Sequence, residues 1–212
     1  MRRPYRTRVP ADDFVARARA ELERAGGAIL IDLEFTCWED SLRTQWADPA
    51  RPCEVIEVGL AAYDASTRAA GASFSALVRP RINPTLSAYC LDLLHIPQHE
   101  IDDAPDLPTV LGGVATWLRT LPFDGLPTCG WGEGDRIHFT ENAARVGAAD
   151  PLAGRPHVDL RAVMTARYGH SAPIERDHVR SVAALPPNPR RHRALDDALD
   201  LTHFLALVLP AR

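Results

Sequence analysis

The sequence contains no lysine: all 24 basic residues are arginine, against 28 acidic residues, for a net charge of −4. Proteins that bind duplex nucleic acid over a broad surface are usually basic, so any nucleic-acid contact is expected to be local. The absence of lysine has two readings. One is recognition of anions by arginine forks; the simpler one is GC-rich coding bias, which also fits the abundant alanine and proline.

The sequence also lacks any apolar run near the roughly 20 residues of a membrane-spanning helix. Its arginine-rich start, residues 1–10, is not followed by the apolar segment of a secretory signal. We therefore expect a cytoplasmic protein with no membrane partner. The four cysteines (Cys37, Cys53, Cys90 and Cys129) form no C-x-x-C pair, which argues against structural zinc and favours buried thiols.

The composition is that of an average folded protein. The chain has 212 residues, of which 46% are hydrophobic and 25% charged, and this length fits one domain. We expect residues 1–27 to form an N-terminal extension that includes a helix, and residues 28–209 to form the domain.

The hydropathy pattern predicts an α/β fold. Strands are expected at 28–34, 54–63, 72–78 and 126–131, and helices at 11–25, 87–94, 107–121, 134–147, 157–168 and 193–209. Loops are expected at 39–53 and at 171–191, where the run PPNPRR opposes regular structure. Three strands followed by alternating helices and strands indicate a mixed sheet.

Two carboxylates stand out in the first strand. Asp32 and Glu34 are two residues apart, so their side chains share one face of a strand that is otherwise apolar. Two buried carboxylates side by side are costly unless a cation lies between them, and oxygen ligands suit Mg²⁺ or Mn²⁺. The alternative is that the strand emerges into solvent at this point.

Two later segments add candidates. Asp135 follows the glycine-rich turn CGWGEG, and His192 and Asp197 surround the start of the last helix. Each is weak alone, because acidic residues are common at helix starts.

Taken together, these segments resemble the DEDDh 3′–5′ exonucleases, whose fold is like that of ribonuclease H. The order is D-x-E on the first strand, an aspartate after a later strand, and H-x-x-x-x-D on a C-terminal helix. The nearest pattern is that of the histone-mRNA and RNA-interference exonucleases and of bacterial sporulation-inhibitor homologues. The resemblance covers about residues 28–208. It includes the segments IDLEFTCWED, EVIEVG, CGWGEGD and HRALDDA, and the stretch from Asn83-Pro84 through LSAYC to Ile96-Pro97-Gln98.

The resemblance implies a ribonuclease H-like fold, with a mixed five-stranded sheet flanked by helices, for an exonuclease domain at 28–209. It implies that two divalent cations, Mg²⁺ or Mn²⁺, are bound by four carboxylates: Asp32, Glu34, Asp135 and Asp197. His192 would be the general base, and the family spacing selects Asp197 rather than Asp196. The implied product is a nucleoside 5′-monophosphate.

The resemblance also suggests substrate contacts. Phe35 and Thr36 follow the first two acids where the family holds the 3′-terminal nucleotide, and Leu86 and Tyr89 match its base pocket; plain core packing is the alternative. Arg190, Arg191 and Arg193 either contact phosphates or belong to a solvated loop. Gly134 stands where related chains often have an aromatic residue, and Leu94-His95 replaces a usual threonine, so the nucleotide preference stays open.

The expected substrates are single-stranded RNA or DNA 3′ ends. Three other functions are alternatives: an oligoribonuclease-like cleaner of short oligonucleotides, a non-catalytic nucleic-acid-binding or regulatory protein, and a polymerase proofreading module. RNA and DNA both stay open, and so does a homodimer, which many relatives form.

Overall fold

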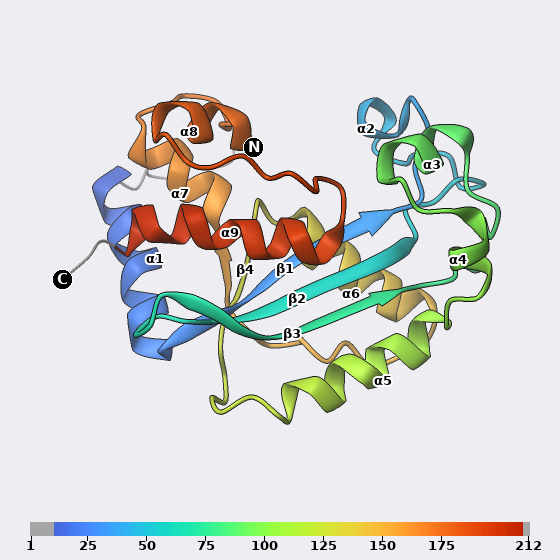
Figure 1. Ribbon diagram of the computed structural model, residues 1–212, viewed down its shortest axis with the longest axis horizontal. Coiled ribbons are helices and arrows are strands. Elements are labelled where there is room, and N and C mark those ends of the chain that lie inside the picture. Colours follow the sequence, from blue (N-terminus) through green and yellow to red (C-terminus); the bar gives the residue numbers. More distant parts are fainter. Residues whose placement is uncertain (1–10, 210–212) are drawn as a thin grey trace, which may run out of the picture.

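The computed structural model describes residues 11–209, whose centre is a mixed five-stranded sheet with helices on both faces (Figure 1). The strands stand in the order β3-β2-β1-β4-β5. β1 pairs antiparallel with β2 and parallel with β4, while β2–β3 is antiparallel and β4–β5 parallel. The predicted α/β class with a mixed five-stranded sheet is confirmed. The strands are β1 Gly27–Phe35, β2 Val55–Asp64, β3 Ala69–Leu77, β4 Thr128–Gly130 and β5 His157–Asp159.

The described part of the chain contains long and short helices. The longest are α1 Ala11–Ala25, α5 Leu107–Leu118, α6 Gly134–Arg145 and α9 Ala194–Val208. The shorter ones are α2 Ser41–Thr44, α3 Ala88–Leu94, α4 Gln98–Asp102, α7 Leu160–Arg167 and α8 Arg176–Val182. No helix within residues 11–209 is long and apolar enough to cross a membrane.

Alternation along β1 divides the core into two layers. Ala28 and Leu30 pack in one cluster with side chains of α1, α7 and α9. Ile29, Ile31 and Leu33 point to the opposite face and pack with α5 and α6. Because side-chain direction alternates along a strand, the residues at positions 32 and 34 continue the face that α9 covers.

The structure corrects three predicted segments. Residues 157–159 begin a predicted helix but form strand β5, which pairs with β4; Asp159 then caps α7 by accepting a hydrogen bond from the Ala162 N–H at 2.9 Å. The predicted loop 171–191 contains helix α8, which Val179 anchors in the core. The loop at 39–53 likewise contains the single turn α2.

These differences between prediction and structure have the same physical origin. A three-residue strand and a seven-residue helix are too short to show periodicity, and tertiary contacts stabilise them instead. The remaining predicted elements are observed with ends shifted by three residues or fewer, and all four cysteines are buried free thiols. The arginine-rich residues 1–10 lie outside the described part of the chain.

Candidate active site

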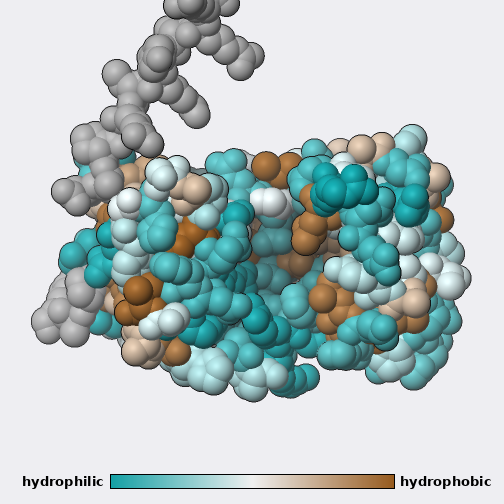
Figure 2. All heavy atoms as spheres, turned by 90° about the horizontal axis from the view of Figure 1, so that it is seen from above, coloured by the Kyte–Doolittle hydropathy of each residue, from teal (hydrophilic) through white to brown (hydrophobic). Residues whose placement is uncertain are grey.

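A cleft opens where the carboxyl end of β1 meets the start of α9. It lies between α8 on one side and the α2–α3 segment on the other, and the surface is visibly hollowed there (Figures 1 and 2). The cleft encloses about 420 Å³. All five residues predicted to carry the chemistry line it: Asp32, Glu34, Asp135, His192 and Asp197. Residues separated by up to 165 positions therefore meet at one site.

A glycine on β2 brings the start of α9 close to the sheet. Gly59 lies opposite Asp32 in the β1–β2 ladder. A Cβ atom at this position would lie 2.1 Å from the carbonyl carbon of Ala194, so only glycine permits the observed approach. Asp197, one turn further along α9, is thereby held beside Asp32.

A buried ion pair anchors the same helix end. Glu57 is 2% exposed and accepts hydrogen bonds from Arg193 Nη2 at 3.0 Å and from the Ala194 N–H at 3.2 Å. The acidic side chain also suits the positive end of the helix dipole. Glu57 therefore fixes the residue that follows His192, and Arg193 is engaged by an ion pair rather than free in a solvated loop.

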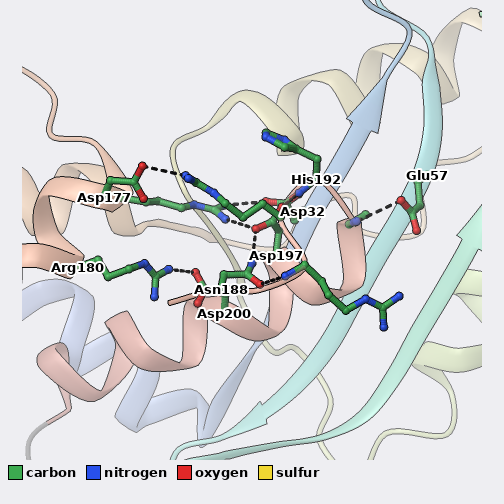
Figure 3. Close-up of polar contacts among 12 residues, drawn as sticks. Asp32, Glu57, Asp177, Arg180, Asn188, His192, Asp197 and Asp200 are labelled. Atoms are coloured by element: carbon green, nitrogen blue, oxygen red, sulfur yellow. Dashed lines mark hydrogen bonds and ion pairs between the residues drawn. The ribbon is translucent and has the colours of Figure 1, made fainter. Parts of the chain in front are cut away.

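Asp197 faces the cleft and its neighbour does not. The Asp197 carboxylate accepts hydrogen bonds from the His192 N–H at 2.8 Å and from Asn188 Nδ2 at 2.7 Å (Figure 3). The His192 backbone is left-handed, with φ of 62°, and its side chain is exposed at the cleft. Asp196 instead lies 3.6 Å from Arg190 Nε and lines a separate hollow.

An arginine from α8 reaches the carboxylates. Arg176 Nη2 lies 2.7 Å from Asp32 Oδ1, and Nη1 lies 3.3 Å from Asp197 Oδ1. Burial lowers the pKa of Arg176, but the charge of Asp32 and its hydrogen bond outweigh that effect, so the pKa is raised. The guanidinium is therefore a permanent positive charge inside the cleft.

Burial and mutual repulsion favour the protonated forms of three acids. Desolvation raises the pKa of Asp32 well above its ordinary value, although Arg176 opposes the shift. Desolvation, followed by the charge of Asp32, likewise raises the pKa of Glu34. Burial raises the pKa of Asp135 to about 7. One arginine is thus not enough to neutralise these carboxylates when they are ionised.

The donor set fits a divalent cation. One ligand atom each of Glu34, His192 and Asp197 lie within 4.8 Å of one another. Within residues 11–209, no hydrogen bond or ion pair engages the Glu34 carboxylate. Carboxylate oxygens suit Mg²⁺ or Mn²⁺, and a cation would relieve the repulsion that raises these pKa values.

The four predicted substrate contacts do not line the 420 Å³ pocket itself, although Leu86 and Tyr89 belong to the α2–α3 side of the cleft. Both polar groups of Thr36 are engaged, because its N–H donates to the Glu54 carbonyl at 2.9 Å and its hydroxyl donates to the Pro52 carbonyl at 3.0 Å. Leu86 is buried in a small apolar cluster. Phe35 makes edge contacts with aromatic neighbours, and Tyr89 is 38% exposed. Tyr89 is thus the one of the four whose side chain is freely accessible.

Four residues that shape the site were not assigned a role from the sequence: Glu57, Gly59, Arg176 and Asn188. Glu57 and Gly59 belong to the run EVIEVG, and their place in this motif is the signal that could have marked them. The Arg176–Asp32 pair spans 144 positions, and no local pattern predicts it.

Sequence comparisons place the chain among exonucleases. A profile of the exonuclease family (RNase_T) matches residues 29–204. The 3′-5′ exonuclease Snipper of Drosophila melanogaster is 28% identical, over 91% of this chain and 73% of the relative. The 3′-5′ exonuclease crn-4 of Caenorhabditis elegans is 26% identical, over 83% of this chain and 61% of the relative.

Solved structures show the same fold. The nuclease domain of 3′hExo, described as a DEDDh family member bound to rAMP, superposes with a TM-score of 0.73. The alignment covers 87% of this chain and 92% of that one at 21% identity. The ribonuclease H-like arrangement of sheet and helices is therefore shared with this group.

Proposed function

The chain belongs to the exonuclease family, and on this premise we propose that it is a metal-dependent 3′–5′ exonuclease that releases nucleoside 5′-monophosphates. The observation that carries the proposal is the meeting of Asp32, Glu34, Asp135, His192 and Asp197 in one cleft. The matched relatives named 3′-5′ exonucleases support the direction of cleavage.

We propose that the four carboxylates bind two divalent cations, Mg²⁺ or Mn²⁺. When bound, such a pair supplies Lewis acidity toward the phosphodiester and lowers the pKa of water. The charges of Asp135 and Asp197 both act on Asp32, so these three carboxylates would hold the cations together. Asn188 and the His192 N–H hold the Asp197 carboxylate in its orientation.

His192 is proposed as the general base. Its imidazole is exposed at the cleft and has a ring nitrogen within 4.8 Å of carboxylate oxygens of Glu34 and Asp197. An imidazole at this position can accept a proton from the attacking water at neutral pH. The paired Glu57 and Arg193 keep the adjacent backbone in place during the transfer.

The proposed substrates are single-stranded nucleic-acid 3′ ends. One matched structure is of a 3′-exonuclease that recognises the histone mRNA stem-loop, and the 3′hExo nuclease domain holds rAMP, which favours RNA as the first substrate to test. A narrow acidic cleft on an acidic protein fits a chain end rather than a broad duplex surface.

The test uses 5′-labelled single-stranded RNA and DNA with Mg²⁺, Mn²⁺ or EDTA. Wild type is compared with Asp32→Asn, Asp197→Asn and Asp196→Asn. The last two variants make the same change on adjacent residues, but only Asp197 faces the cleft. We expect a ladder shortening from the 3′ end, abolished by EDTA and by the first two variants, and kept by Asp196→Asn.

A ladder that Asp197→Asn leaves intact would refute the assigned site. The absence of any 3′ shortening with folded, metal-binding protein would refute the exonuclease proposal and favour a binding role. Cleavage limited to the shortest oligonucleotides would instead indicate an oligoribonuclease-like enzyme.

We also propose that residues 28–209 form the exonuclease domain, that the protein is cytoplasmic and that it forms a homodimer. Truncation before residue 28, cell fractionation and light scattering test them in turn. Because Leu22 of α1 is fully buried against the core, the truncated protein is expected to be folded but less stable.

A further inference from the structure

Arg176 contacts two of the carboxylates that would bind cations. Its guanidinium bridges Asp32 at 2.7 Å and Asp197 at 3.3 Å, and its side chain is 17% exposed. Both carboxylates are metal ligands in the function proposed above. A guanidinium and a divalent cation repel each other at such short range, so the two cannot share these oxygens without cost.

The helix that carries Arg176 is anchored by other contacts. Arg180 pairs with Asp200 of α9 at 2.5 Å (Figure 3). Its guanidinium also lies over the Phe204 ring. Val179 is buried in the core, and Arg161 pairs with Glu175 at 2.7 Å. The Arg176 side chain can therefore leave the carboxylates by rotating about its own bonds while α8 stays in place.

The Arg176 side chain also contacts an aromatic ring within the cleft. Its guanidinium carbon lies 5.7 Å from the centre of the Trp131 ring, within the range of a cation–π contact. The guanidinium can keep this contact with the ring while it turns away from the carboxylates. Withdrawal from Asp32 thus does not require exposure of the whole side chain.

We propose that Arg176 is an internal counterion that competes with divalent cations for Asp32 and Asp197. This inference rests on the proposed metal-dependent function. In the metal-free protein, Arg176 neutralises part of the carboxylate charge, and it must release both acids before they can bind a cation. The protein then needs a higher cation concentration for occupancy than the carboxylates alone would require.

The test measures Mn²⁺ binding by calorimetry on the full chain without nucleic acid. Wild type is compared with Arg176→Met, which keeps an unbranched side chain but removes the charge. Arg191→Met is the matched control, because Arg191 also lines the cleft but pairs with Asp177 at 3.1 Å rather than with a predicted ligand. We expect Arg176→Met to bind Mn²⁺ about tenfold more tightly, as expected when a competing ion is removed, and Arg191→Met to stay within about twofold.

Several results would overturn the counterion role. If wild type binds Mn²⁺ and Arg176→Met binds no more tightly, Arg176 does not compete, while the proposed function stands. If neither protein binds Mn²⁺, both proposals fall. An equal gain in Arg191→Met would show a general charge effect instead of competition.

A structure of wild type saturated with Mn²⁺ provides a second test that needs no variant. The expected result is that Arg176 no longer contacts Asp32 and Asp197. Retention of the Arg176–Asp32 contact at its present 2.7 Å beside bound Mn²⁺ would refute the proposal, even if the Met variant failed to fold.

Discussion

Replacement of Gly59 by alanine tests whether the approach of α9 to the sheet sets the geometry of the site. A Cβ atom at Gly59 would lie 2.1 Å from the Ala194 carbonyl carbon and 2.3 Å from the Leu195 nitrogen. Ordinary contacts of a Cβ atom begin at 3.4 Å. Both neighbours are backbone atoms, so the start of α9 must retreat by about 1 Å, taking His192 and Asp197 with it.

The size of the effect follows from this displacement. A misplacement of about 1 Å in a catalytic constellation can cost about 100-fold in rate. Overpacking a well-packed core costs about 1–3 kcal/mol. We therefore expect Gly59→Ala to lower kcat on a single-stranded oligonucleotide about 100-fold and to lower the free energy of unfolding by about 1–3 kcal/mol.

The control is a second glycine of the same sheet. A Cβ atom at Gly71 of β3 would meet no atom within 4 Å, so Gly71→Ala is expected to leave kcat and stability unchanged. Rates are measured by gel with saturating cation, and stability by urea denaturation. Wild-type kcat and stability in Gly59→Ala would refute the argument that this close approach positions the site.

Three further predictions concern single side chains. Glu57→Gln leaves Arg193 and the start of α9 without a carboxylate, and urea denaturation is expected to show a loss of about 1–3 kcal/mol. His192→Ala removes an exposed imidazole, so single-turnover rates are expected to fall about 10²–10⁴-fold while the melting temperature is unchanged. Burial raises the pKa of Asp135 in the folded protein to about 7. The contribution of Asp135 to the free energy of unfolding therefore falls as the pH rises from about 4 to about 7. In EDTA, Asp135→Asn is expected to be more stable than wild type at pH 8 by up to about 4 kcal/mol, with the difference vanishing near pH 4.

The fold was predictable where the pattern was long and regular. Strands β1 to β3 and the helix α9 carry nine or more residues each, and their apolar spacing marks them in the sequence. β5 has only three residues, and its first, His157, is held by hydrogen bonds with Thr128 Oγ1 at 2.9 Å and the Gly132 carbonyl at 2.8 Å. Such a short strand forms because β4 lies beside it and pairs with it. The hydropathy pattern of the sequence does not show this pairing.

The sequence likewise predicts some features of the site and not others. The spacing of Asp32 and Glu34 fixes their common face, because alternation along a strand is a local property. That Arg176 bridges Asp32 and Asp197 depends on where α8 packs, and this segment was predicted as a loop. The engagement of Thr36 by residues 52 and 54 is also a tertiary fact. Local geometry was therefore predictable, while the partners of each group were not.

The contacts that position the site are separate from the groups that would bind cations. α9 is anchored by Glu57 with Arg193 at one point and by Asp200 with Arg180 at another, and neither pair includes a predicted metal ligand. The raised pKa values of Asp32 and Glu34 show that the ligand carboxylates themselves are electrostatically unfavourable in the folded chain. Because the anchoring pairs stabilise the helix independently, binding and release of the proposed cations would leave the geometry unchanged. Changes in the anchors should thus move the ligands together, whereas changes in Arg176 should alter cation affinity and leave their positions as they are.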